Sequence, residues 1–338
     1  MKTRKALANA VAGLLLGGAV TAAEVELEVF TGPQRKESVQ PVYPRMALQN
    51  LREGWVQMHF MVGPDGRPYE IAVTDSMGDT AFQRSAVRAL EKSLFEPARL
   101  DDAPIDAGYS RKFTFEIQGN LGARARFLTT HRAIRKAIGA DDRERARQLI
   151  DELSARNHYE DALLHLAKFY YLGKWGEPDA QLRALDRAIA HETTAKYLPE
   201  EVFVHALLAH FGLLTQMRDY HRALEAFESL SAFELDEGTR AALQADAEQI
   251  RVLKTDDRAY SVAGEIDDTA NWYFDLFKDD FAVLDVHGEI AEVKLRCDRK
   301  YVFFRFDPAM AYHVNDTYGD CHLTLVGNPG TAFRLRQM

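Results

Sequence analysis

The sequence predicts a multi-domain protein of the α+β class, in which a small α/β sandwich precedes an α-helical repeat and a small all-β module. Three changes in the spacing of apolar residues support this division. These residues alternate over 55–62, recur at three and four residues through 123–253, and then alternate again. We therefore expect a sandwich at 41–119, helices at 122–255 and a β module at 258–338.

The first part of the sandwich is predicted to be a short helix followed by a hairpin. Pro44 suits the first turn of a helix that runs to about Leu51, and Gly54 is expected to end this helix. Residues 55–62 alternate as a half-buried strand does, and Gly63-Pro64-Asp65-Gly66 predicts the turn to a return strand.

A second helix and a last strand complete the sandwich. Asp79 is a candidate cap for a helix in which Phe82 and Leu90 share one face. Alternation returns at Phe113 and Phe115, which predicts the last strand of a small antiparallel sheet.

Short motifs follow one another between residues 41 and 115. In order, they are Pro41-Val42-Tyr43-Pro44-Arg45-Met46-Ala47, Glu53-Gly54-Trp55-Val56, Val62-Gly63-Pro64-Asp65-Gly66, Phe95-Glu96-Pro97-Ala98 and Phe113-Thr114-Phe115. In this order and spacing they resemble the C-terminal domain of the TonB family. In that family the domain transmits energy from the inner membrane to outer-membrane receptors of Gram-negative bacteria. The resemblance implies a periplasmic protein that binds other proteins and performs no catalysis.

The resemblance also implies a mode of binding. In the family, a short segment of the partner adds a strand to the sheet edge formed by the domain's last strand, here residues 109–117. Strand addition uses backbone hydrogen bonds, and alternate side chains tune specificity. The candidate partner-binding residues are Tyr109, Arg111, Phe113 and Phe115 along the strand, with Tyr43 and Pro44 where the first helix begins. Alternatively, the aromatic side chains on one face of this strand fill the core.

The resemblance ends before residue 41. The family carries a membrane anchor and a long proline-rich spacer there, whereas this chain has only Pro33 and Pro41 before Pro44. The family's anchor also uses a serine and a histidine to contact an ExbB–ExbD motor, and residues 6–22 contain neither.

Two functions stay open at this point. The first is a TonB-like protein that binds an extended segment of outer-membrane receptors or transport partners, with an ExbB/ExbD-type motor as a second partner if the chain is anchored. The second is a cell-envelope scaffold or adaptor without energy transduction, which the missing spacer favours.

The N-terminus predicts export. Lys2, Arg4 and Lys5 precede an apolar stretch and the small residues Val20-Thr21-Ala22 or Thr21-Ala22-Ala23, which is the pattern of a signal peptide over residues 1–22. The alternative is an uncleaved segment that anchors the protein in the inner membrane. Residues 23–40 are polar and are expected to form a short, mobile lead-in.

The central segment resembles a degenerate tetratricopeptide repeat. Turn signals lie at Gly139-Ala140-Asp141, Gly173–Pro178 and Asp219. The Ala-Leu pairs at 184–185 and 223–224 are 39 residues apart, compared with about 34 in a tetratricopeptide array. Stacked helix pairs of this kind bind peptides or proteins. The alternative is a plain helical bundle that binds nothing.

The C-terminal segment predicts a β sandwich or barrel. Turn signals lie at Asp267-Asp268, His287-Gly288, Asp298-Arg299 and Asn328-Pro329-Gly330. The chain's two cysteines, Cys297 and Cys321, lie here, and a pair in an oxidising compartment favours a disulfide.

Other chemistry finds little support in the sequence. The formal net charge of −9 argues against a nucleic-acid partner. His205 and His210 are five residues apart and so do not share a helix face, and no HExxH or paired CxxC motif occurs. We expect no enzyme, no cofactor and no metal site.

The signal peptide can be tested directly. Because its apolar stretch is short and ends in small residues, we expect N-terminal sequencing of the periplasmic fraction to begin near Ala23. Membrane-bound material that retains Met1 would instead identify an anchor.

Overall fold

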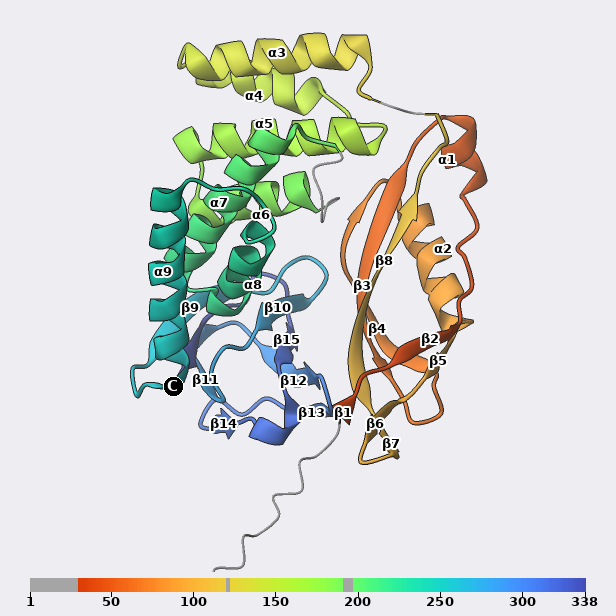
Figure 1. The fold of residues 1–338 in the computed structure, drawn as a ribbon, viewed down its shortest axis with the longest axis vertical. Helices are drawn as coiled ribbons and strands as arrows, with labels where there is room; N and C mark the ends of the chain where they lie inside the picture. The colour runs from red at the N-terminus through yellow and green to blue at the C-terminus, as the bar shows by residue number, and fades with distance from the viewer. Residues whose placement is uncertain (1–29, 120–121, 191–196) are drawn as a thin grey trace, which may run out of the picture.

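The computed structural model describes residues 30–119, 122–190 and 197–338, and the predicted signal peptide lies outside them. The chain is a multi-domain α+β protein, as predicted. One face of the N-terminal sheet carries its own helix, and the opposite face is turned toward the helical segment and the C-terminal β strands (Figure 1). Among the described residues, no helix is both long and apolar enough to cross a membrane.

The N-terminal segment is built on a three-stranded antiparallel sheet. Its strands are β3 (Gly54–Val62), β4 (Pro68–Met77) and β8 (Ala107–Phe115), in the order β4-β3-β8. Helix α2 (Thr80–Glu91) covers one face, and Asp79 caps it by accepting a hydrogen bond from the Ala81 N–H, as predicted. Alternate side chains of β3, including Met58 and Phe60, are fully buried in the core between this face and α2.

Gly54 does not end the first helix, which corrects the expectation from the sequence. Helix α1 (Arg45–Gln49) ends earlier, at Asn50, and Gly54 is the first residue of β3. A Cβ atom at Gly54 would lie 2.7 Å from the Met77 carbonyl oxygen and 2.8 Å from the Phe82 ring. The glycine is therefore needed because two elements approach the strand closely.

The segment before α1 is more ordered than its polar composition suggested. Strand β1 (Phe30–Thr31) pairs with β6 (Ala98–Leu100), and β2 (Gln34–Glu37) pairs with β5 (Leu94–Glu96). β6 also pairs with β7 (Ala103–Ile105). Strand pairing thus occurs within residues 30–37 of the expected lead-in, because backbone groups pair in a ladder whatever the polarity of the side chains.

The central segment contains helices that pack in consecutive pairs. They are α3 (Ala125–Gly139), α4 (Arg143–Glu152), α5 (His158–Trp175), α6 (Pro178–Ile189), α7 (Glu200–Met217), α8 (Tyr220–Leu230) and α9 (Glu237–Thr255). The predicted turns separate α3 from α4, α5 from α6 and α7 from α8. Classification of this segment as a tetratricopeptide-like repeat stays a prediction.

The C-terminal segment is a sandwich of two four-stranded antiparallel sheets, with orders β10-β15-β12-β13 and β14-β11-β16-β9. The strands are β9 (Tyr260–Glu265), β10 (Asn271–Asp275), β11 (Asp280–His287), β12 (Ile290–Cys297), β13 (Tyr301–Arg305), β14 (Ala311–His313), β15 (Cys321–Gly327) and β16 (Ala332–Gln337). Both sheets contribute to one core, which includes Phe281, Val293, Leu323 and Leu335. The four predicted turns fall between strands.

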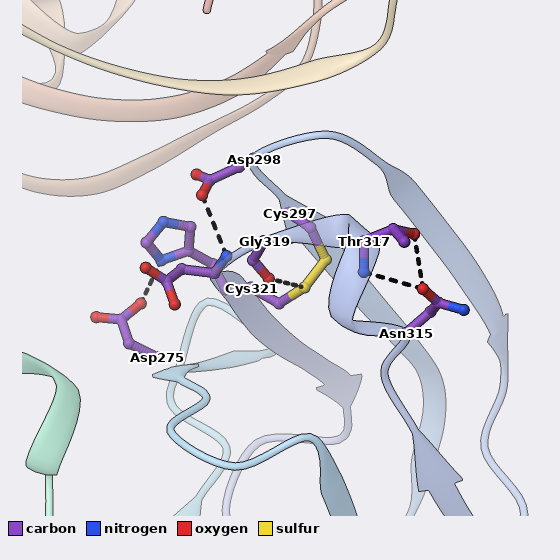
Figure 2. Close-up of a disulfide and its surroundings, with 9 residues drawn as sticks. Asp275, Cys297, Asp298, Asn315, Thr317, Gly319 and Cys321 are labelled. Atoms are coloured by element: carbon purple, nitrogen blue, oxygen red, sulfur yellow. Dashed lines mark hydrogen bonds and ion pairs between the residues drawn. A yellow bond between two sulfur atoms is a disulfide. The ribbon is translucent and has the colours of Figure 1, made fainter. Parts of the chain in front are cut away.

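A disulfide joins Cys297 to Cys321, as predicted (Figure 2). The two residues lie opposite each other on neighbouring strands, at the end of the β12–β15 ladder. Nearby, the Asp298 carboxylate accepts a hydrogen bond from the Asp320 N–H at 3.1 Å. The disulfide and this bond hold together the ends of β12 and β15.

Glu53 joins the N-terminal sheet to the helical segment. Its backbone N–H donates to the Arg156 carbonyl at 2.8 Å. Its carboxylate is buried and accepts hydrogen bonds from the backbone N–H groups of Ile117 at 3.0 Å and His158 at 3.2 Å. A single acidic side chain therefore ties the start of β3 to the N-terminus of α5.

Glu70 joins the same sheet to the C-terminal sandwich. It lies beside an irregularity in the β3–β4 pairing and has a φ of 48°. Its carboxylate pairs with Lys294 at 3.3 Å and Arg296 at 3.2 Å, both on β12. Although burial opposes ionisation, the Lys294 ammonium beside it holds the pKa of Glu70 below its ordinary value.

The disulfide should stabilise the C-terminal sandwich. Replacing both cysteines (Cys297→Ser with Cys321→Ser) should lower its free energy of unfolding by about 3 kcal/mol, because the bridge closes a loop of about 25 residues. Thermal unfolding would measure the loss. Thiol labelling of unfolded, unreduced wild-type protein is the control, and two labelled cysteines per chain would contradict the bridge.

The Glu70 ion pairs should hold the sheet against the sandwich. We expect Glu70→Gln to cost about 1 kcal/mol at neutral pH, since the carboxylate is partly exposed and solvent screens the pairs. The ion pairs lower the pKa of Glu70 in the folded state. The stability that wild type gains over Glu70→Gln should therefore be lost as the pH falls through that folded-state pKa. Hydrogen exchange along β4 and β12 would report the loosened contact.

Glu292→Gln is the matched control for this experiment. Glu292 also approaches Lys294, at 3.9 Å, but its side chain is 47% exposed and this pair lies within β12. Equal exchange profiles for the two variants would show that Glu70 does not hold the sheet in place.

Candidate partner-binding site

Strand β8 is an edge of the N-terminal sheet. Each residue from Ala107 to Phe115 lies opposite one residue of β3, without a bulge. Within the described ranges, β8 pairs with no strand other than β3. Along an edge strand, every second backbone N–H and C=O points away from the sheet. The outer side of β8 therefore offers the backbone groups that strand addition needs.

The predicted partner-binding side chains of β8 all lie on one face. Tyr109 is opposite Phe60, and Phe113 is opposite Val56, both on the face covered by α2. Phe113 and Phe115 are each only 3% exposed. These two aromatic rings therefore fill the core, and at their positions only the backbone is available to a partner.

Tyr109 and Arg111 lie closer to the rim of this face and are half-buried. The Tyr109 ring packs on Phe60 and Phe95, at centroid distances of 5.7 and 5.5 Å. The Arg111 guanidinium lies 4.1 Å over the Phe113 ring and donates to the Ser38 hydroxyl at 2.7 Å. Both side chains are thus held in place at the edge.

Tyr43 and Pro44 position α1 near the same core. The Tyr43 ring meets Phe82 and Phe115 edge to face, and its hydroxyl donates to the Arg52 carbonyl at 2.7 Å. Burial, with Glu53 nearby, raises the pKa of Tyr43 to about 12. Pro44 occupies the N-cap position of α1. The structure therefore gives these two residues a role in packing the helix.

The sequence did not reveal that the residues around α1 expose apolar side chains. Val42 is 80% exposed, and Met46 and Leu51 are each 66% exposed. Within α1, the buried residue is Ala47. The helix is a single short turn, so its inner side holds one small residue.

The opposite face of the sheet is covered by the rest of the chain. Trp55, His59 and Met61 point to this face, and they are 1%, 8% and 0% exposed. A cavity of about 820 Å³ lies between this face, helices α6 to α8 and strands β10, β12 and β15. Both faces of the sheet are therefore occupied, one by α2 and the other by the two following segments.

The described residues hold no set of three or more His, Cys, Asp or Glu side chains placed to bind a metal ion. His205 forms a hydrogen bond with the Glu201 carbonyl of its own helix, whereas His210 faces Asp186 at 2.8 Å.

Comparisons with known proteins match the N-terminal segment of the chain. The family model described as Gram-negative bacterial TonB protein C-terminal matches residues 39–117. Protein TonB of Pseudomonas aeruginosa is 39% identical over 79 residues, which are 23% of this chain and 23% of that protein. Protein tonB2 of the same organism is 34% identical over 77 residues, which are 23% of this chain and 28% of that protein.

A solution NMR structure of the Pseudomonas aeruginosa TonB CTD is 32% identical and covers 27% of this chain and 91% of its own, with a TM-score of 0.24. The chain spans about a quarter of the length of the curated relatives it matches. The match covers the sheet, α1, α2 and the edge strand β8, and it stops where the helical segment begins. Residues 39–117 are therefore a C-terminal domain of the TonB family, joined here to further helices and strands.

Proposed function

We propose that this chain is a TonB-type transport protein of the periplasm that binds an extended segment of an outer-membrane receptor or transport partner by strand addition to β8. The observation that carries this proposal is the position of β8 at the edge of a sheet whose two faces are both covered. A partner that engages this sheet must therefore do so along its edge.

Backbone pairing would supply most of the affinity. An added strand bonds to outward N–H and C=O groups, so the buried Phe113 and Phe115 side chains do not hinder it. The side chains that remain for specificity are Tyr109 and Arg111 at the rim. Tyr43 and Pro44 contribute by holding α1 and its exposed apolar residues in position.

The proposal includes no catalytic step. Its partners are proteins: an outer-membrane TonB-dependent receptor, and an ExbB/ExbD-type motor if the chain is membrane-anchored. The acidic net charge of −9 gives no electrostatic support to a nucleic-acid partner.

A second candidate is a cell-envelope scaffold that transmits no force. The observation that favours it is the enclosure of the sheet by Glu53, Glu70 and the cavity-lining side chains, which fixes the domain within a larger body. Co-purification of ExbB/ExbD-type proteins with the exported chain would favour transduction, and its absence under crosslinking would favour the scaffold.

Proline substitutions along β8 test the edge. Neighbouring residues of β8 direct their backbone N–H groups to opposite sides of the strand. Of the two variants Arg111→Pro and Lys112→Pro, one therefore loses a hydrogen bond to β3, and the other loses an N–H donor that points outward. The variant that loses the outward donor should stay folded and bind a receptor peptide at least tenfold more weakly. Fluorescence anisotropy with a labelled peptide from the periplasmic N-terminus of an outer-membrane TonB-dependent receptor measures this.

Lys112→Ala is the matched control, because it removes the side chain and keeps the N–H group. Thr114→Pro repeats the test, since Thr114 directs its N–H to the same side as Lys112. Folded proline variants that all bind the peptide as wild type does would place binding elsewhere, such as on the helical segment.

A further inference from the structure

The cavity between the three segments has a lining with an unusual distribution of charge. Among its acidic residues, Asp186 on α6, Asp219 beside α8 and Asp275 on β10 surround one guanidinium, that of Arg222. Arg222 pairs with Asp186 and lies 3.3 Å from Asp219. Three carboxylates thus share one permanent positive charge on this side of the cavity.

Two histidines interact with these carboxylates. His322 pairs with Asp275, which raises the pKa of His322 against the opposing effect of burial. His210 hydrogen-bonds Asp186 at 2.8 Å. Asp219 has no histidine partner among the described residues, and burial raises the pKa of its carboxyl group to about 6.

Three of the four other cations in the described lining have acidic partners outside it. Arg187 lies 3.9 Å from Asp161, Arg296 lies 3.2 Å from Glu70, and Arg183 pairs with Asp179. The Lys112 ammonium lies 4.5 Å over the Trp55 ring. These positive charges are therefore largely compensated from the back of the wall, which leaves the Asp219 side of the cavity acidic.

Buried polar atoms without partners gather on this lining. Asp219 is 7% exposed, and its Oδ1 atom has no hydrogen-bond partner in the described part of the chain. The same holds for Nδ1 of His210 and Nε2 of His59, at 9% and 8% exposure. Burial, with His322 and Arg296 nearby, lowers the pKa of His59 to about 3, so His59 is neutral at pH 7. Buried acceptors left unpaired are costly, and a ligand that donates to them recovers that cost.

An aromatic ring lines the same cavity as these acids. Tyr273 and Asp275 are two residues apart on β10, so their side chains leave the same face of the strand, and both line the cavity. Tyr273 is 38% exposed, which leaves its ring accessible. A carboxylate next to an accessible ring favours an organic ammonium ion, which can pair with one and lie against the other.

We propose that this cavity binds a small organic amine, with its ammonium group held by Asp219 and its carbon chain packed against Tyr273. The volume of about 820 Å³ lies within the range of small-molecule sites. A metal ion is a poorer occupant, because no three ligating side chains converge among the described residues. The site takes side chains from one face of β8, whereas the proposed strand addition would use the backbone groups of its outer edge.

Titration calorimetry of the full exported chain with 1,5-diaminopentane, 1-aminopentane and L-lysine tests the proposal. Wild type should bind at least one of these amines, and hexanoate, which has a similar chain and the opposite charge, should not bind. Asp219→Asn, which keeps the shape and removes the charge, should weaken amine binding at least tenfold. Tyr273→Ala should weaken it by a smaller factor.

Asp246→Asn is the matched control, because Asp246 is exposed on α9, away from the cavity lining. It should bind the amine as wild type does. Asp219→Asn should fold, since it removes a buried charge and leaves Arg222 paired with Asp186; equal melting curves would verify this. The proposal is overturned if wild type binds none of the amines at millimolar concentration, if hexanoate binds equally well, or if folded Asp219→Asn keeps wild-type affinity. Thr114 lies outside the cavity lining, so a loss of receptor-peptide binding in Thr114→Pro would leave the amine affinity unchanged.

Discussion

The architecture depends on the burial of the second face of the N-terminal sheet. A three-stranded sheet with a helix on one side leaves its other side to solvent, yet Trp55 and Met61 on that side are at most 1% exposed. Burying each such side chain contributes about 1.5–3 kcal/mol. Two carboxylates fix the geometry of this contact. Glu53, just before β3, binds the N-terminus of α5, and Glu70 on β4 binds β12. Because both faces of the sheet are covered, a partner strand can pair with it only along a backbone edge.

The burial of the second face also accounts for the cavity. The sheet has a core of its own, and the helices share a core with Tyr260 and Phe277 of the C-terminal segment. The surfaces where the sheet meets these segments carry polar as well as apolar side chains and do not fill the space between them. Polar side chains such as His59 and Asp219 occupy these surfaces, because neither belongs to the core of its own segment.

Local features were the ones that the sequence predicted. The Asp79 cap, the hairpin turn after β3, the turns of the sandwich and the disulfide each depend on residues close in sequence or on a cysteine pair. The role of Gly54 was missed because Met77 and Phe82, which require the glycine, approach it from other elements. The roles of Glu53 and Glu70 carried no local signal, since their partners lie in distant segments. Asp219 was only a turn signal, because several segments together form the cavity that it lines.

The two faces of β8 connect the edge to the cavity. Arg111 faces the core beside α2, whereas Ser110 and Lys112 face the cavity. A strand added to β8 would continue this alternation, so every second side chain of the partner would extend the wall that carries Lys112. A shift of Lys112 over Trp55 would therefore change contacts both with the partner's side chains and within the cavity lining. The backbone of one strand would thus bind the partner while its side chains shape the cavity.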